Sequence, residues 1–343
     1  VNHVSKAGVI TLWHFTTRPR ALVIGVGGGG DMIHIEKELG APEVVGVEIN
    51  PDLVHAMRGA LGRYLAPTLK EQEIVIADGR TYVRMSDEQF DLIFLSFADL
   101  FIYFPSSLVQ MENYLYTTEA MVDYWERLTP RGLIFFGYHL SLKRPAQPDA
   151  LLRILTTVHA ALRGLGVARP EDHVVVQRDP LHPRKGFLIV SKRPLERQVV
   201  RRYLTEYRHR DRYPNTFLYY PGKRKGDNPF AAYMLASSRD RWLDRYPLDV
   251  SPVTDDRPFF FDFDRSHVVI GDQLLRFGQL ALGLVVVPAF LLLLGYRSLR
   301  QRVVLAVGTA GILVTIGHAL LEAELIKALG VYIGSPIHSL SLV

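Results

Sequence analysis

The residues best suited to chemistry are glycines that follow an apolar run near the start of the chain. The run Ala21–Ile24 leads directly into Gly-Val-Gly-Gly-Gly-Gly over 25–30, and a helical pattern follows. Glycine allows the backbone to approach a ligand closely, and the first turn of a helix offers unpaired N–H groups at a positive dipole end. We therefore expect Gly25, Gly27 and Gly29 to form a ligand-binding loop.

Two carboxylates follow the next two apolar runs. Glu48 closes the second run, 19 residues beyond Gly29, where its carboxylate could accept both ribose hydroxyls of a nucleoside. Asp78 and Gly79 come directly after the third run. Asp78 could accept a hydrogen bond from the exocyclic amine of adenine, or it could cap the helix that begins near Thr81. The two roles can coexist.

The ligand expected from this pattern is a sulfonium nucleoside. No basic residue of the kind that binds a pyrophosphate lies near the glycine loop. The pattern of strands is also typical of proteins that bind S-adenosyl nucleosides. S-adenosylmethionine or its decarboxylated form is therefore favoured over NAD as the co-substrate, and no metal is expected.

Polar residues after the fourth run are candidates for the reaction itself. The run 90–95 is followed by Ser96 and Asp99, and the carboxyl end of a strand faces the reaction site in open α/β sheets. Asp99, helped by Asp31 at the start of the first helix, could orient or deprotonate an amine; alternatively, Asp99 caps a turn. The candidate substrate-pocket residues further along are Glu112, Tyr114 and Tyr116, and the two tyrosines could also simply pack.

The elements that must position these residues form an α/β domain. Short apolar runs alternate with helical patterns, which is typical of a parallel sheet with crossover helices. The predicted parallel strands are Ala21–Val26, Glu43–Glu48, Glu73–Ala77, Phe90–Leu95 and Gly132–Tyr138, and His173–Gln177 with Gly186–Ser191 form an antiparallel hairpin. This Rossmann-like layout, with a C-terminal hairpin, is that of class I S-adenosylmethionine-dependent transferases.

Composition shifts suggest five regions along the chain. The 343 residues carry a net charge of +5, and 48% of them are hydrophobic. The sequence has no cysteine, which excludes a disulfide scaffold and thiol chemistry. We expect an N-terminal lead-in (1–20), the nucleoside-binding domain (21–192), a basic aromatic insertion (193–250), a connector (251–272) and a membrane region (273–343).

The basic insertion concentrates positive charge. Residues 192–245 carry a net charge of +8, with Tyr and Phe interleaved. An anionic lipid surface, a solvated insertion and a nucleic acid are the alternatives; no recognition motif for nucleic acid accompanies the charge, so we expect no nucleic-acid partner. In the connector, Asp255 and Asp256 could bind a cation or, as we favour, form a structural clasp with arginines of the domain.

Two long apolar segments predict transmembrane helices. Residues 277–296 and 303–321 are each about the length that crosses a ~30 Å hydrocarbon core, and the alternative is a pair of buried core helices. We therefore expect a multi-pass protein of a bacterial-type inner membrane, with the lipid bilayer as a partner. The nucleoside-binding domain is expected on the cytosolic face, further chain is expected at both ends, and an oligomer is possible.

The motifs resemble those of the spermidine/spermine synthases, the polyamine aminopropyltransferases, and in particular the integral-membrane branch of that family. The matching strings are VIGVGGGGDM (23–32), VVGVEINP (44–51), ADGRTYV (77–83), ENYLYTTEA (112–120), PVTDDRPFFF (252–261) and GHALLEAELIKALGVYIGSP (317–336). The resemblance implies aminopropyl transfer to an amine or polyamine. Members of that family carry an Asp-x-x-Asp motif after the fourth strand, and its first aspartate is implicated in catalysis; here Ser96 stands at that first position and Asp99 at the second.

Two positions depart from the soluble members of that family. Gly28 and Ser96 stand where those proteins carry aspartates. Binding a polycationic amine favours several carboxylates, and here Asp31, Asp99 and Glu112 would have to suffice. The leading hypothesis is a spermidine synthase-like transferase. The alternatives are a methyltransferase and a non-catalytic domain that senses the nucleoside or a polyamine for a transporter-like membrane protein.

Overall fold

The computed structural model describes residues 3–59, 72–98, 112–140, 149–179, 182, 184–208, 216–263, 308 and 311. The chain divides into two compact units, Val1–Leu108 with Asn113–Phe263, and Val109–Glu112 with Asp264–Val343. All helices and strands described below belong to the first unit, which carries the glycine loop.

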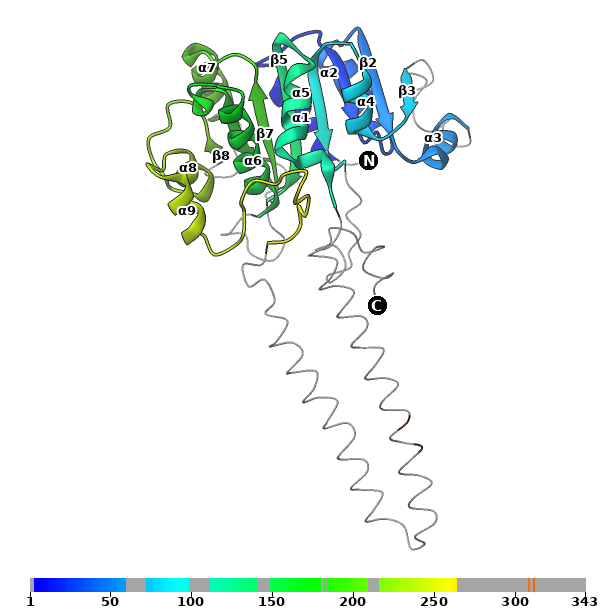
Figure 1. The fold of residues 1–343 in the computed structure, drawn as a ribbon. Helices are drawn as coiled ribbons and strands as arrows, with labels where there is room; N and C mark the ends of the chain where they lie inside the picture. The colour runs from blue at the N-terminus through cyan, green and yellow to red at the C-terminus, as the bar shows by residue number, and fades with distance from the viewer. Residues whose placement is uncertain are drawn as a thin grey trace, which may run out of the picture. The chain divides into compact units, whose positions relative to one another are not determined.

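The first unit is built on an eight-stranded sheet in the order β3-β2-β1-β4-β5-β7-β6-β8 (Figure 1). The first five strands run parallel, and β7 pairs antiparallel with β5. The parallel strands are β1 (Arg20–Ile24), β2 (Glu43–Glu48), β3 (Glu73–Ile76), β4 (Phe90–Ser96) and β5 (Leu128–His139); the antiparallel ones are β6 (Val174–Arg178), β7 (Lys185–Ser191) and β8 (Phe217–Tyr219). This order confirms the predicted Rossmann-like, methyltransferase-type sheet with its C-terminal hairpin.

Helices cover both faces of the sheet, as a parallel sheet requires. Successive residues of β1 alternate between two apolar clusters, with Leu22 and Ile24 in one and Ala21 and Val23 in the other. The first cluster packs against α4 (Gly79–Met85), α5 (Thr118–Glu126), α6 (Ala150–Gly164) and α8 (Pro229–Met234). The second packs against α1 (His3–Leu12), α2 (Gly30–Leu39), α3 (Pro51–Arg58) and α7 (Arg197–Arg208).

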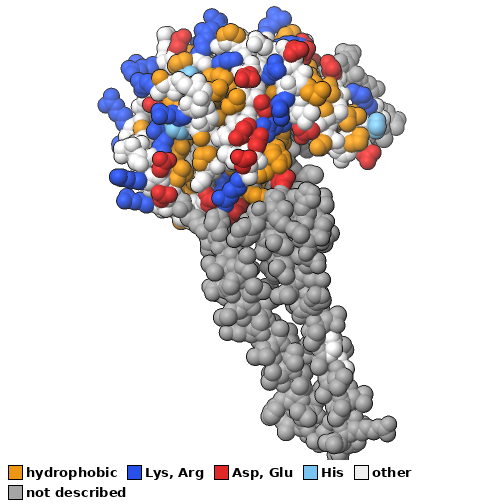
Figure 2. All heavy atoms as spheres, in the orientation of Figure 1, with side chains coloured by type: hydrophobic (Ala, Val, Ile, Leu, Met, Phe, Trp, Pro, Cys, Tyr) orange, Lys and Arg blue, Asp and Glu red, His pale blue; other side chains and the backbone are white. Residues whose placement is uncertain are grey.

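The basic insertion extends this domain. Its strand β8 pairs with β6 at the sheet edge, and Tyr203 of α7 is fully buried in the second apolar cluster. The insertion also forms α8 and α9 (Arg239–Arg245). Figure 2 shows Lys and Arg side chains along the side of the domain where α7, α8 and α9 lie in Figure 1. Positive charge is therefore carried on a folded surface whose apolar side contributes to the core.

A buried arginine holds the first part of the connector against α6. Arg153 is 3% exposed, and its guanidinium donates to the carbonyls of Phe260 at 2.8 Å and Asp262 at 2.6 Å. Its charge lies 3.5 Å from the Asp249 carboxylate. Burial lowers the pKa of Arg153 to about 10, although the nearby carboxylates oppose that shift. Residues 249–263 are thus packed against the domain through a charged group that needs these acceptors.

The predicted membrane location requires correction. The longest described helix, α6, has 15 residues, or about 22 Å at 1.5 Å per residue, and it lies in the protein core. Within the described ranges, no helix is both long enough and apolar enough to cross a bilayer. This finding contradicts the prediction of a multi-pass inner-membrane protein. The segments predicted to span it, 277–296 and 303–321, lie outside the described residues apart from Gly308 and Gly311.

Candidate functional site

The glycine loop lies at the carboxyl end of β1 and is shaped by left-handed backbone. Gly25, Gly27 and Gly29 have φ of 79°, 54° and 75°, a region that side chains other than glycine rarely adopt. A β-carbon on Gly25 would lie 2.8 Å from the Cα atom of Ala98, so the loop packs directly on the residues that follow β4. A β-carbon on Gly28 would meet nothing within 4 Å, which leaves the tip of the loop open.

Glu48 fastens this loop to the end of β2. Its Oε2 atom accepts a hydrogen bond from the Gly27 N–H at 3.0 Å, and its Oε1 atom accepts one from the Asn50 N–H at 3.0 Å. The residue is 7% exposed. A carboxylate offers about four lone-pair positions, so each oxygen can still accept another hydrogen bond. Glu48 therefore combines a structural role, which the sequence reasoning did not foresee, with remaining capacity for a ligand.

Asp78 caps α4 at the end of β3. Its Oδ1 atom accepts from the Thr81 N–H at 2.8 Å, and the side chain is exposed. The capping alternative considered from the sequence is thus confirmed. Among the described residues no hydrogen bond occupies Oδ2. The following residue, Gly79, packs on β1, because a β-carbon there would lie 2.3 Å from Ile24 Cγ2.

The next residue, Arg80, forms the clasp with the connector that the sequence suggested. Arg80 is 7% exposed and donates to both oxygens of Asp255, at 2.6 and 2.8 Å, and to Asp123 at 2.8 Å. Asp255 also accepts from the Thr117 hydroxyl at 2.7 Å. Burial would lower the pKa of Arg80, but these hydrogen bonds outweigh it and raise the pKa. The ADGRTYV string (77–83) and the TDDRPFFF string (254–261) are therefore joined by a bidentate ion pair.

Of the three residues predicted to take part in the reaction, the structure describes Ser96 and Asp31. Ser96 ends β4 opposite Gly137, and a β-carbon on Gly137 would lie 2.7 Å from the Ser96 hydroxyl oxygen. Asp31 is half-buried in the first turn of α2, where a carboxylate favours the helix dipole. Asp99 lies outside the described residues, so its predicted role stays a prediction.

The predicted pocket residues also differ from one another. Glu112 is half-buried, and Tyr114 is 43% exposed at the start of a short 3-10 helix. Tyr116 is 1% exposed, and its ring packs 4.6 Å from Phe260 and 5.8 Å from Tyr138. Tyr116 therefore lies in the aromatic core, which corresponds to the packing alternative considered for it.

A cluster that the sequence reasoning missed lies where β4, β5 and β7 meet this edge. Phe97 follows β4 with a φ of 52°, and its ring lies 4.8 Å from that of His139 at the end of β5. The Lys185 ammonium, opposite His139 in the antiparallel register, lies 5.1 Å from the Phe97 ring centroid. Burial, helped by Lys185, lowers the pKa of His139 below its usual 6.5. The feature that draws attention to this cluster is the positive φ of Phe97, a backbone conformation that a phenylalanine rarely adopts. A backbone angle cannot be read from the sequence, so the cluster was not predicted.

The residues that the structure describes include no group of three or more His, Cys, Asp or Glu side chains arranged to hold a metal ion. The described part of the candidate site comprises the backbone loop, the carboxylates of Glu48 and Asp78, and the cluster of Phe97, His139 and Lys185.

Fold and site together define a Rossmann-like, methyltransferase-type α/β domain; the strand order of the sheet carries this assignment. No family model matches the chain. A curated relative, the polyamine aminopropyltransferase of Thermococcus kodakarensis (strain KOD1), is 28% identical over 121 residues, 33% of this chain and 39% of the relative. The match thus spans about two-fifths of the relative's length.

Solved structures show the same general similarity at lower identity. A spermidine synthase in complex with the transition-state analogue AdoDATO is 16% identical, with 71% of this chain and 74% of that chain covered and a TM-score of 0.41. Human methyltransferase-like protein 13 in complex with SAH is 17% identical, with 61% and 92% covered and a TM-score of 0.43. These comparisons do not show the integral-membrane branch that the motifs resemble.

Proposed function

We propose that the chain binds S-adenosylmethionine or decarboxylated S-adenosylmethionine and transfers an alkyl group from its sulfonium to an acceptor, as a spermidine synthase-like transferase does. The observation that carries the proposal is the bond between Glu48 and Gly27. It holds the glycine loop and a carboxylate with spare lone pairs together at the ends of β1 and β2. Two neighbouring ribose hydroxyls would donate to the two Glu48 oxygens, while the open loop tip at Gly28 admits the rest of the nucleoside.

Asp78 supports the same ligand at the next strand. Its Oδ1 atom is used by the helix cap, and its Oδ2 atom would accept from the adenine amine. Because Gly79 packs closely on Ile24, the cap and the loop are held at one edge of the sheet. This arrangement would recognise adenosine by its ribose and its base.

The leading reaction is aminopropyl transfer to an amine. The amine lone pair forms the new N–C bond, the C–S bond breaks, and its electron pair stays on the neutral thioether 5′-methylthioadenosine. The protein must position the amine and accept the proton that the new ammonium releases. We assign that role to Asp99, assisted by Asp31. The hydroxyl of Ser96 is too weak a base to take it, so its contribution would be a hydrogen bond.

A second candidate, methyl transfer from S-adenosylmethionine, is favoured by the cluster of Phe97, His139 and Lys185. The Lys185 ammonium, close to where the acceptor would bind at the end of β4, would repel a polycationic amine. A neutral or anionic acceptor would not be repelled. A domain that binds the nucleoside without turnover is the third alternative, favoured by the serine at position 96.

Product analysis separates these functions. The full chain is incubated with decarboxylated S-adenosylmethionine and putrescine, and separately with S-adenosylmethionine and a mixture of amine, hydroxyl and carboxylate acceptors. Aminopropyl transfer releases 5′-methylthioadenosine and a lengthened amine, and methyl transfer releases S-adenosylhomocysteine. Binding without either product would exclude catalysis with these acceptors and favour the sensing role.

A further inference from the structure

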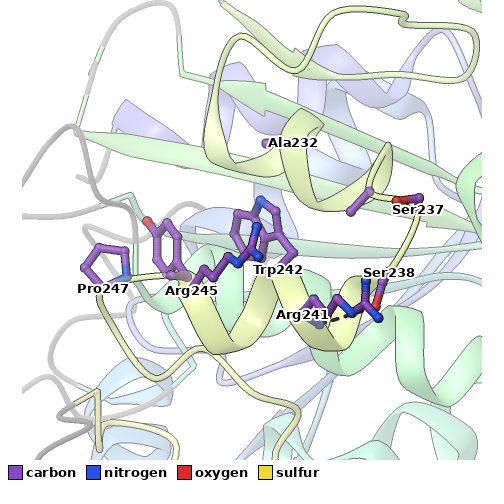
Figure 3. A pocket seen from close by; sticks show the side chains of 9 residues that line it. Ala232, Ser237, Ser238, Arg241, Trp242, Arg245 and Pro247 are labelled. Atoms are coloured by element: carbon purple, nitrogen blue, oxygen red, sulfur yellow. Dashed lines mark hydrogen bonds between the residues drawn. The ribbon is translucent and has the colours of Figure 1, made fainter.

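A hollow on the basic insertion lies apart from the residues assigned to the nucleoside. It has a volume of about 400 Å³ and is lined entirely by residues of α8, α9 and the segments next to them. That volume falls in the range of small-molecule sites. Its lining residues are Ala232, Ala236, Ser237, Ser238, Arg241, Trp242, Arg245, Tyr246 and Pro247. Figure 3 shows Arg241, Trp242 and Arg245 projecting from α9 at this hollow.

The charged part of the hollow consists of two arginines. Arg241 and Arg245 are four residues apart on α9, so their side chains share one side of the helix. Both are exposed, and neither guanidinium makes an ion pair or hydrogen bond with any described residue. The acidic residues of the same helix, Asp240 and Asp244, do not line the hollow. Two guanidiniums that no described residue neutralises, lying at one hollow, favour a ligand with an oxyanion.

Other arginines of the domain are used differently. Arg80 and Arg153 are buried and bound to carboxylates and carbonyls. Arg239, at the start of α9, donates to the Met234 carbonyl at 3.0 Å and does not line the hollow. The two arginines of the hollow are therefore available to a ligand in a way that these three are not.

The remaining wall is aromatic and already ordered. The Trp242 ring stacks on Tyr246, with centroids 4.8 Å apart and an interplanar angle of 17°, and meets Tyr233 edge-on at 5.4 Å. Small and apolar residues complete the wall at Ala232 and Pro247. Inorganic phosphate would fill only a small part of this volume, so the wall indicates that the ligand also has an apolar body.

We propose that this hollow is a binding site for a small phosphomonoester with a flat apolar body. Arg241 and Arg245 hold its phosphate, the hydroxyls of Ser237 and Ser238 supply further donors, and the body packs beside Trp242 and Pro247. The site takes a ligand other than the sulfonium nucleoside, because its charge suits an anion. The proposal stands independently of the function assigned to the glycine loop.

Calorimetric titration of the full chain with phenyl phosphate tests the proposal. We expect saturable binding that is stronger than that of inorganic phosphate, and no binding of phenol. The double variant Arg241→Gln/Arg245→Gln should weaken binding at least tenfold. The matched control is Arg197→Gln/Arg201→Gln, which removes two exposed arginines four residues apart on α7 and should leave the affinity within twofold.

Each other outcome overturns the proposal. An equal loss of affinity in both double variants would show that net charge alone attracts the anion. If the folded parent protein does not bind phenyl phosphate, the proposed site does not exist. Binding to vesicles containing phosphatidic acid without binding of phenyl phosphate would assign the arginines to a lipid headgroup instead of a small ligand. A ligand beside Trp242 should quench part of the tryptophan fluorescence of the parent protein. If phenyl phosphate quenches the fluorescence of Trp242→Phe by the same amount, the ligand binds elsewhere.

Discussion

The carboxylate of Glu48 accepts a hydrogen bond from the backbone N–H of Gly27 at 3.0 Å, which ties the end of β2 to the loop after β1. The same carboxylate accepts from Asn50 at the start of α3. One buried side chain thus fixes two backbone segments at the edge of the sheet where the fold binds ligands. The site that we propose for the nucleoside is therefore formed before any ligand arrives.

Gly25→Ala should destabilise the protein, whereas Gly28→Ala should not. An alanine at position 25 would keep a φ of 79° and place its β-carbon 2.8 Å from Ala98 Cα, which together cost about 3 kcal/mol. At Gly28 the β-carbon meets open space, so we expect a change within about 0.5 kcal/mol. Urea unfolding of both variants measures this difference. Equal stability of the two variants would contradict the described shape of the loop.

The clasp between Arg80 and Asp255 should contribute measurably to stability. Arg80→Leu leaves Asp123 and Asp255 without their buried partner, and we expect a loss of about 3 kcal/mol in the free energy of unfolding. Asp255→Asn keeps the hydrogen bond with Thr117 and should cost less. As the control, Glu43→Gln breaks the exposed pair with Arg20 and should cost under about 1 kcal/mol.

A double-mutant cycle isolates the clasp from its surroundings. Combining Arg80→Leu with Asp255→Asn should cost less than the sum of the single changes. The clasp should also depend on pH, through Asp255. Partial burial would raise the pKa of Asp255, but the hydrogen bonds from Arg80 and Thr117 outweigh burial and lower this pKa below 3.8. The contribution should therefore be present above about pH 4 and be lost as the pH falls through the lowered value. Strict additivity in the cycle would contradict the pairing.

His159 should make stability depend on pH between about 6.5 and 4. Burial, together with Arg239 and Arg163, lowers the pKa of His159 to about 4, so in this window the unfolded chain binds a proton that the folded protein does not. Stability should rise with pH across the window, by up to about 3 kcal/mol from this group. Unfolding of His159→Gln at pH 4.5 and pH 7 should show a smaller difference than the parent protein.

The control for that measurement is His55→Gln, which removes an exposed histidine of α3. It should leave the difference between the two pH values unchanged. An unaltered difference in His159→Gln would show that other groups produce the dependence on pH.

The sequence predicted the sheet well because its central strands are buried on both faces. Glu43–Glu48 was predicted with the bounds that β2 has, while β5 begins at Leu128 instead of Gly132. Strand β8 and helix α1 were not predicted, since three residues give too short a pattern and α1 is defined by its packing: Gly8 approaches Phe135 so closely that a β-carbon would lie 2.6 Å away.

The candidate site was predictable only in part. Glycines and carboxylates at strand ends can be recognised from type and spacing. The predicted placement of Glu48 at the end of β2 and of Asp78 just after β3 is therefore confirmed, while their role as ligand-binding residues stays a prediction. The hydrogen bond from Gly27 to Glu48 depends on how two strands align, which no local pattern encodes. Tyr116 lies in the core because Phe260, far along the chain, packs on it. The Phe97–His139–Lys185 cluster joins three strands and has no signature in any one of them.

Asp78→Asn should weaken nucleoside binding without destabilising the fold. Asparagine caps helices about as well as aspartate, so its oxygen can keep the bond from Thr81. Its amide nitrogen would then face the adenine amine, donor against donor, and we expect at least a tenfold loss of affinity. Inosine-containing analogues should lose little of their affinity on the same change. Loss of stability in Asp78→Asn would show that the carboxylate serves the fold instead.

Calorimetric titration of the full chain with S-adenosylmethionine and its decarboxylated form tests the proposed nucleoside site most directly. We predict that at least one of them binds, and that Glu48→Gln weakens binding at least tenfold, about 1.4 kcal/mol. Glu73→Gln, which changes an exposed carboxylate at the opposite end of β3, should bind as the parent protein does. Binding of neither nucleoside, or equal affinity in Glu48→Gln and the parent, would contradict the proposed site.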